Sequence, residues 1–140
     1  MIILDTNVIS ILMQASPDAS AVKWLDRQPP ESIWTTSING FEIVYGLESL
    51  AKGKRRTVLH EAFEIVLHQD LEDRILQFDS FAAREAARIA AFLRSKGRPV
   101  EVRDVMIAGI AAARHGSLAT RNVQHFIDSK IQLVSPWDSF

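Results

Sequence analysis

The hydrophobic positions of the chain fall into two kinds of segment. Five short runs are nearly continuous in apolar or β-branched residues and are bounded by turn-forming residues, a pattern that predicts β-strands. These runs are Met1–Leu4, Ile33–Thr36, Ile75–Phe78, Ser117–Thr120 and Ile131–Val134. The stretches between them repeat apolar residues three or four positions apart, which is the period of an amphipathic helix. Strands and helices are therefore expected to alternate along the chain.

The predicted helices have recognisable ends. They cover Asn7 to about Gln14, Ser20–Arg27, a segment capped by Ser37 or Asn39 that reaches about Lys52, Thr57–Gln69, Phe81–Lys96 and Val102–His115. A glycine just after the last helical residue favours termination, so Gly53, Gly97 and Gly116 are expected to end three of them. The helix before Gly116 is apolar around most of its circumference and is expected to be buried.

The alternation of strands and helices predicts an α/β fold. Right-handed crossovers then give a mostly parallel sheet with helices on both faces, a three-layer α/β/α arrangement. The first strand, Ile2 to Leu4, has no polar alternation, as expected for a central strand buried on both sides. The sequence contains no repeat and no long linker, so we expect one domain over residues 1–140.

Composition narrows the class of protein. Hydrophobic residues make up 47% and charged residues 24%, which is typical of a globular chain, and the absence of cysteine excludes disulfide frameworks and thiolate sites. The apolar opening is interrupted at Asp5, which leaves no signal-peptide core. The run from Val105 to Ala113 is far shorter than the ~20 residues that cross a bilayer. We therefore expect a cytoplasmic protein without a membrane segment.

The overall charge does not indicate nucleic-acid binding, because the formal net charge is −1. Two local groups of cations are more informative. The first group, here called the basic loop, comprises Lys52, Lys54, Arg55 and Arg56, and the second comprises Arg94, Lys96 and Arg98. Either could contact a phosphate backbone. Taken alone, each is explained as well by a solvated helix end, which is the commoner case.

Three acids and an amide fall where α/β proteins bind ligands, outside the carboxyl ends of the strands. Asp5 directly follows the first strand, Glu42 lies near the start of the helix after the second, and Asn122 follows the fourth. Asp104 begins the buried helix that leads into the fourth strand, and the start of such a helix lies at this same end of the sheet. The four side chains are expected to converge.

Each of these residues also has a structural explanation. Asp5, Asp104 and Asn122 could be helix caps, and Glu42 a half-exposed helix residue. Together the acids favour a different explanation. Two carboxylates ~4 Å apart repel by about 4 kcal/mol at an effective dielectric of about 20, against a typical stability of about 5–15 kcal/mol. Such a cluster requires a cation, and oxygen ligands suit Mg²⁺ or Mn²⁺. The sequence thus predicts phosphodiester hydrolysis by a metal-activated water.

The motifs resemble those of a known family. The opening from Met1 through Asp5, Thr6 and Asn7 is similar to that of PIN-domain proteins, in particular the VapC and FitB-like toxins of bacterial toxin–antitoxin pairs. Residues 37–46, 97–108 and 119–126 are similar to the later motifs of that family, and the match extends to about Trp137.

The resemblance implies a five-stranded sheet in the order 3-2-1-4-5, a homodimer, and an endoribonuclease that leaves a 5′-phosphate and a 3′-hydroxyl. It implies a small VapB- or FitA-like antitoxin that wraps the toxin and blocks the site, so the assembly is the homodimer or a heteromeric complex with this antitoxin. Asp5 and Asp104 match the principal metal ligands, Glu42 a further acid, and Thr6 a supporting hydroxyl. Many members carry a fourth acid where this chain has Asn122, which leaves one- and two-metal sites both open. Arg121 joins the basic loop as a candidate for contacting RNA.

Other functions fit less well. A phosphotransferase of the haloacid-dehalogenase type needs a second Asp where Asn7 stands, and a receiver domain needs an acidic pair after its first strand. The serious alternative is a PIN module of weak or lost activity that binds its antitoxin and regulates DNA. The presence of Asp5, Glu42 and Asp104 favours the enzyme.

Overall fold

A sheet of five strands runs through the middle of the protein, whose computed structural model describes residues 1–137. The last three residues of the predicted domain lie outside this range. The strands are β1 (Ile2–Leu4), β2 (Ile33–Thr36), β3 (Ile75–Leu76), β4 (Ser117–Ala119) and β5 (Gln132–Val134). Their order is β3-β2-β1-β4-β5, and all four neighbouring pairs are parallel. The α/β class and the predicted strand order are therefore confirmed.

The sheet is buried on both faces. In β1, Ile3 and Leu4 are both inaccessible to solvent, yet they belong to different hydrophobic cores, because successive side chains of a strand point to opposite faces. Leu118 and Ala119 divide in the same way on β4. The continuous apolar run of the first strand thus supplies one residue to each core, and the three-layer arrangement is confirmed.

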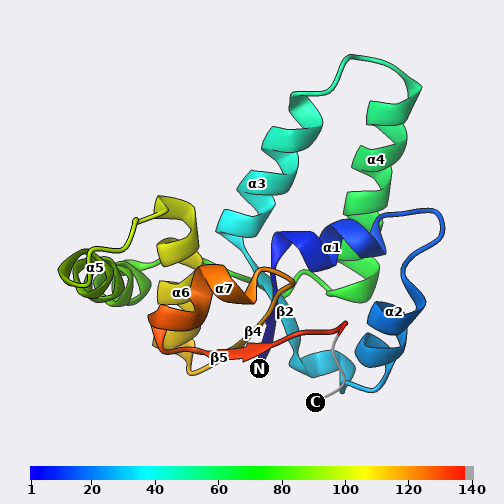
Figure 1. The fold of residues 1–140 in the computed structure, drawn as a ribbon. Helices are drawn as coiled ribbons and strands as arrows, with labels where there is room; N and C mark the ends of the chain where they lie inside the picture. Colours follow the sequence, from blue (N-terminus) through cyan, green and yellow to red (C-terminus); the bar gives the residue numbers. More distant parts are fainter. Residues whose placement is uncertain (138–140) are drawn as a thin grey trace.

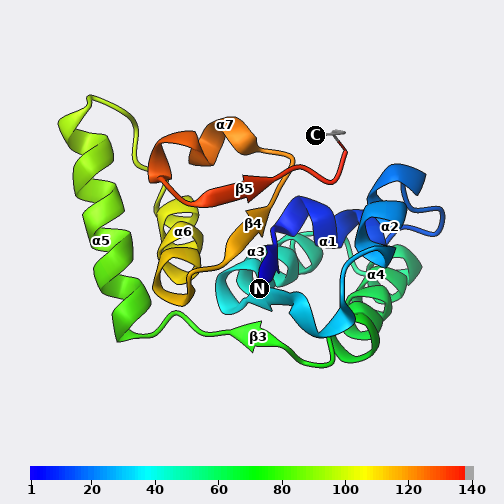
Figure 2. The ribbon, with the colours of Figure 1, turned by 90° about the horizontal axis from the view of Figure 1, so that it is seen from below.

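Seven α-helices cover the two faces of the sheet within residues 1–137. They are α1 (Thr6–Leu12), α2 (Ala19–Asp26), α3 (Ser37–Glu48), α4 (Lys54–Ile65), α5 (Ser80–Ser95), α6 (Val102–Arg114) and α7 (Val123–Phe126). Short 3₁₀ turns at Pro30–Ser32 and Ile127–Ser129 and a π-helical turn at Val66–Asp70 complete the chain. Helices α5 and α6 lie to one side of the strands and α1, α2 and α4 to the other (Figure 2).

Helices α3 and α4 form a hairpin that projects from the rest of the molecule (Figure 1). Here the sequence prediction was wrong in detail. Helix α3 ends at Glu48, before the predicted Lys52, and Gly53 does not end it. Instead, Gly53 precedes α4 with φ +155°, a backbone conformation that favours glycine, and α4 begins at Lys54 rather than at Thr57. The basic loop therefore forms the tip of this hairpin.

The start of α3 also differs from the prediction. The N-cap is Thr36, whose hydroxyl accepts a hydrogen bond from the backbone N–H of Asn39, rather than Ser37 or Asn39 itself. The side chain of Asn39 is consequently available for other contacts.

Helix α6 is buried as predicted, with Ile107, Ala108 and Ile110 inaccessible to solvent. Gly109 allows α5 to approach closely, because a Cβ at this position would lie only 2.6 Å from the carbonyl oxygen of Ala82. This packing brings α6, whose first turn carries Asp104, into close contact with α5. Within residues 1–137, every helix is too short or too polar to cross a lipid bilayer.

Candidate active site

All five residues predicted to form the catalytic centre line one pocket of about 380 Å³, here called the acidic pocket. These residues are Asp5, Thr6, Glu42, Asp104 and Asn122, and they are joined by Asn7, Ser10 and Ile11. They come from the segment after β1, from α3, from the first turn of α6 and from the segment after β4. Side chains up to about a hundred residues apart in sequence are therefore brought to one edge of the sheet.

Asp5 is held at the base of the pocket, only 4% exposed, and each of its oxygens accepts two hydrogen bonds. Its Oδ1 accepts from the backbone N–H of Thr6 and from Asn39 Nδ2, both at 2.9 Å. Its Oδ2 accepts from Thr120 Oγ1 at 2.7 Å and more weakly from Asn7 Nδ2 at 3.4 Å. These donors offset the cost of burying a carboxylate and fix its orientation.

Asn39 connects this carboxylate to Glu42. It is completely buried, and its Nδ2 also donates to Thr6 Oγ1 at 3.0 Å. The Thr6 hydroxyl in turn donates to Glu42 Oε1 at 2.7 Å. Asn39 is itself fixed, because its Oδ1 accepts from the hydroxyl of Thr36 at 2.6 Å. Two of the three acids are thus oriented by one buried amide.

The other oxygen of Glu42 faces a cation. Arg103 lies with its Nη1 3.7 Å from Glu42 Oε2, while its Nε is 3.8 Å from Glu101. The Arg103 side chain is 45% exposed, so its guanidinium remains open to solvent at the mouth of the pocket.

Asp104 is the electrostatically costly member of the group. The pKa of its carboxyl is raised to about 6, mainly because burial disfavours the charged form; the nearby positive charge of His125 lowers this pKa, and the negative charges of Asp5, Glu101 and Glu42 add to the rise. His125 Nδ1 lies 3.5 Å from Asp104 Oδ2. The explanation of Asp104 as an N-cap is wrong, since Glu101 occupies that position and Asp104 lies inside the first turn of α6.

Helix capping explains Asp5 in part, but it does not explain the side chain of Asn122. Asp5 is the N-cap of α1 and accepts from Thr6 N, so it both caps a helix and lines the pocket. Asn122 precedes α7, but its side chain makes no capping hydrogen bond, and its backbone N–H donates to Thr120 Oγ1 at 3.0 Å. Its amide is exposed at the edge of the pocket.

The pocket is lined by carboxylate, amide and hydroxyl oxygens, and the negative charges of its three acids are only partly neutralised by nearby cations. Such oxygen ligands suit a hard divalent cation. Within residues 1–137, however, no three His, Asp or Glu side chains converge closely enough to ligate one ion as they stand. Glu42 instead contacts Thr6 and Arg103, and Asp104 contacts His125. On Asp5, the 3.4 Å bond from Asn7 is the weakest and the most easily replaced by a metal. The metal-binding role of the three acids stays a prediction.

The residues predicted to contact RNA are not gathered at the pocket. The basic loop lies at the far tip of the hairpin, beyond the end of α3 at Glu48, which is itself about 9 Å along the helix from Glu42 at a rise of about 1.5 Å per residue. Arg56 is paired with Glu48 across the hairpin. Arg121 lies nearer, but its guanidinium is stacked 4.1 Å from the ring of Trp137. Their RNA-binding role stays a prediction.

Several residues of the site were missed by the sequence analysis, notably Asn39, Thr120 and Arg103. Asn39 carried a signal, because it lies one helical turn before the buried Ile43 and is therefore a polar residue on an inward face. Thr120 and Arg103 carried none beyond their proximity to Asn122 and Asp104.

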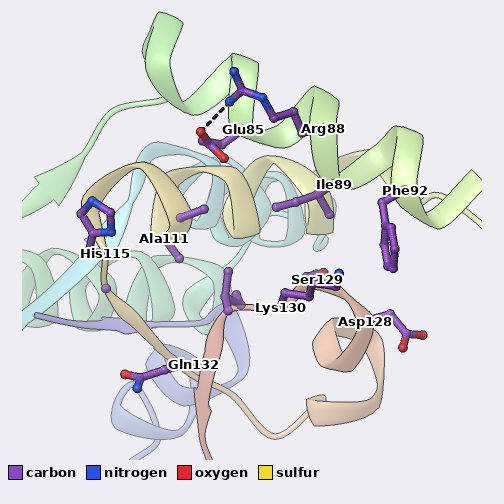
Figure 3. Close-up of a pocket in the computed structure, with 13 residues that line it drawn as sticks. Glu85, Arg88, Ile89, Phe92, Ala111, His115, Asp128, Ser129, Lys130 and Gln132 are labelled. Carbon is purple, nitrogen blue, oxygen red and sulfur yellow. Dashed lines mark hydrogen bonds and ion pairs between the residues drawn. The ribbon is translucent and has the colours of Figure 1, made fainter.

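A larger hollow, of about 620 Å³, lies elsewhere. It is formed by α5, the end of α6 and the start of β5, and it is lined by Arg88, Phe92, His115, Lys130 and Gln132 among others (Figure 3). Because His115 precedes β4 and Gln132 begins β5, this hollow lies at the amino ends of the strands, opposite the acids. It is called the amino-end hollow below.

Comparison with known proteins agrees with the geometry. The sequence pattern of the PIN domain matches residues 2–128. The chain is 35% identical to the VapC ribonuclease Y4jK of Sinorhizobium fredii, over 99% of either chain. It is 33% identical to the toxin FitB of Neisseria gonorrhoeae, over 98% of this chain and 99% of that one. The crystal structure of FitAcB from Neisseria gonorrhoeae superposes with a TM-score of 0.89 at 32% identity, covering 99% of this chain and 100% of the other.

Proposed function

Because the chain belongs to the PIN-domain family, we propose that it is a divalent-metal-dependent endoribonuclease and the toxin of a toxin–antitoxin pair. The observation that carries this proposal is the acidic pocket, in which Asp5, Glu42 and Asp104 meet at the carboxyl ends of the parallel strands. The name of its relative, a VapC ribonuclease, supports the activity, and the name of toxin FitB supports the biological role.

The chain's own residues have distinct parts in this proposal. Asp5 and Asp104 would hold Mg²⁺ or Mn²⁺, with Glu42 as a further acid beside them. Such an ion, when bound, polarises the phosphodiester and acidifies the attacking water. Thr6 and Asn39 orient the carboxylates through the hydrogen bonds described above. Asn122 contributes an amide at the rim instead of a fourth negative charge.

Arg103 has a further part toward the substrate. Its guanidinium is half-exposed at the mouth of the pocket and its contact with Glu42 is long. A phosphate oxygen offers the planar fork of an arginine a stronger, bidentate partner. Arg103 is thus suited to hold an RNA phosphate beside the acids, nearer to the proposed chemistry than the basic loop.

The partner we propose is a small antitoxin that covers the site. The outer face of α3 supports such an interaction, because Phe41 and Tyr45 are 56% and 62% exposed and stack on one another at 5.9 Å. This face adjoins Glu42, so a protein bound there would obstruct the pocket. The predicted homodimer is proposed on family resemblance alone. An RNA substrate implies action in the cytoplasm.

The test of the enzyme is RNA cleavage with Mg²⁺ or Mn²⁺, with and without EDTA, by the wild type and by Asp5→Asn. We expect EDTA to abolish cleavage, and the substitution to lower it by more than about a hundredfold, since it removes a direct metal ligand. Asp26→Asn, an exposed acid on α2, is the matched control and should cleave normally.

Equal activity of wild type and Asp5→Asn would reveal a contaminating nuclease and contradict the proposal. The alternative of an inactive module that binds its antitoxin and regulates DNA would then remain, with DNA binding by the complex as its measurement.

A further inference from the structure

Next to the acidic pocket lies a second, smaller pocket of about 310 Å³, here called the side pocket. It opens between the α5–α6 connection, the first turns of α6 and the segment of α7, and Asp104 lines both pockets. The two are therefore adjoining chambers separated by one of the proposed metal ligands. Anything bonded to a phosphate in the acidic pocket is within reach of the side pocket.

The side pocket combines an apolar base with polar edges. Leu93 and Val105 form the base, and Pro99 one wall. Gln124 and His125, both exposed, stand on the opposite edge with a side-chain amide and an imidazole ring. An amide offers one donor and one acceptor direction, and a flat ring offers a stacking surface.

The walls of the side pocket are tied together. Arg98 on the α5–α6 connection pairs with Asp128 after α7, with Nη2 and Oδ2 2.7 Å apart. Both residues line the pocket. This half-exposed ion pair links the two walls across the opening of the pocket.

We propose that the side pocket is a nucleobase subsite, which receives the base next to the phosphodiester that is cleaved. A nucleobase has two apolar faces and a hydrogen-bonding edge, which match the apolar base of the pocket and the Gln124 amide. A nucleobase is also linked through its sugar to a phosphate. Because Asp104 lines both pockets, the base can lie in the side pocket while its phosphate lies in the acidic pocket. This inference rests on the proposed ribonuclease function and adds to it a place where the enzyme distinguishes substrates.

The amino-end hollow is the larger cavity, but it does not serve this role. It lies at the other end of the sheet, and Figure 3 shows it enclosed by α5, the end of α6 and the segment around Lys130. It shares Asp128 and Ser129 with the side pocket, but none of Asp5, Glu42 and Asp104 lines it, so a base bound there would not border the acidic pocket. Its surface provides the control site for the experiment.

The experiment combines a variant with a modified substrate. Short single-stranded RNAs of mixed sequence are first incubated with the wild type and Mn²⁺, and the product ends are mapped to identify one bond that is cleaved. Abasic ribonucleotides are then placed on either side of that bond. We expect the abasic substrate on one side to lower kcat/KM about 5- to 150-fold, the usual effect of losing one stacked base.

Gln124→Ala should reduce kcat/KM on intact RNA by about 3- to 10-fold, mainly through KM, because it removes one hydrogen bond to the base. On the abasic substrate the same variant should have almost no further effect, since the base is already absent. Arg88→Gln, at the amino-end hollow, should leave both substrates unchanged.

The outcomes separate this inference from the function on which it rests. If Gln124→Ala lowers kcat/KM by the same factor on intact and on abasic RNA, the two losses are independent. That result would contradict the subsite but not the proposed ribonuclease activity. So would a Gln124→Ala variant that cleaves every RNA as the wild type does. Absence of any Asp5-dependent cleavage would contradict the proposed function itself, and the subsite with it.

Discussion

The acidic pocket and the amino-end hollow lie at opposite ends of the same sheet and differ in the way their charges are balanced. The amino-end hollow is larger, about 620 Å³ against about 380 Å³, but its charges are matched locally. Arg88 pairs with Glu85 at 2.6 Å and Asp128 with Arg98 at 2.7 Å, while the Lys130 ammonium lies over the Phe92 ring at 4.3 Å. In the acidic pocket, Arg103 and His125 stand 3.7 and 3.5 Å from the acids they face. Incomplete charge compensation, rather than volume, distinguishes the candidate active site.

The topology of the sheet explains why charge is less well compensated in the acidic pocket than in the amino-end hollow. At the carboxyl ends of parallel strands, successive segments leave the sheet in different directions, and the opening between them admits side chains from β1, α3, α6 and β4. The acids there come from distant parts of the chain. In the amino-end hollow, the paired charges Glu85 and Arg88 come from one turn of α5. Local pairs neutralise one another easily, whereas acids brought together by the fold retain their repulsion.

The largest effect that would sharpen this contrast is expected from Asn39→Ala. The substitution removes the amide that holds both Asp5 and Thr6. We expect kcat/KM for RNA cleavage to fall about 10- to 100-fold and the apparent affinity for Mn²⁺ to fall in parallel, as is usual when a group that orients a metal ligand is lost. Metal titrations of the cleavage rate measure both quantities.

Thr35→Val is the matched control for this variant. Thr35 is equally buried and donates to the carbonyl of Leu4 at 3.1 Å, but it contacts none of the acids. Both variants should lower stability by about 1–3 kcal/mol, because each disrupts buried hydrogen bonds. If Thr35→Val also loses activity to the same extent, Asn39 has only a structural role.

An intermediate effect is expected on stability, through Asp104. Its folded-state pKa of about 6 lies above the ordinary 3.8, so the folded protein binds this proton more tightly than the unfolded chain. The stability gained from protonation is fully present below about pH 4 and is lost as the pH rises to about 6. Asp104→Asn lacks this dependence. Without metal it should be more stable than the wild type by about 1–3 kcal/mol at neutral pH.

Urea unfolding in EDTA at several pH values measures this difference, which should disappear near pH 4. Asp26→Asn, on the exposed surface of α2, should show no comparable pH dependence. A loss of about 1 kcal/mol at neutral pH in Asp104→Asn would mean instead that Asp104 stabilises the start of α6.

The smallest effect is expected at the tip of the hairpin, far from either hollow. Replacing Lys54, Arg55 and Arg56 with Ala should weaken RNA binding a few-fold and flatten its dependence on salt, because fewer phosphate contacts release fewer counterions. Replacing Lys23, Arg27 and Arg88, three exposed cations that belong to neither basic group, removes the same charge and should have less effect. Fluorescence anisotropy over a range of salt concentrations compares the two. Equal losses would assign the effect to overall charge.

Much of the fold could be predicted because its signals are local. The five strands, the buried helix α6 and the end of α5 at Gly97 followed from hydrophobic period and turn residues. The hairpin was predicted less accurately. Its tip is exposed, so burial does not constrain where α3 ends, and Gly53 fits a helix end and a helix start equally well by sequence. In the structure, Gly53 precedes the start of α4.

The convergence of Asp5, Glu42 and Asp104 could also be predicted, from their positions relative to the strands. Their partners could not. The sequence suggested Asn39 only as an N-cap. Because Thr36 is the N-cap of α3 instead, the side chain of Asn39 is free to donate a hydrogen bond to Asp5. Arg103 lies in the first turn of α6, and its direction depends on how α6 is rotated about its axis. That rotation is set by packing against α5, which the sequence does not show.

The sequence by itself determined which residues are apolar, where the chain turns and which acids follow which strands, because these depend on neighbours a few positions apart. Only the tertiary structure decided how the acids are held. The hydrogen bonds of Asp5, the pairing of Glu42 with Arg103 and the burial of Asp104 all join residues distant in sequence. Their strength depends on distances and solvent exclusion that arise once both hydrophobic cores have closed on the sheet.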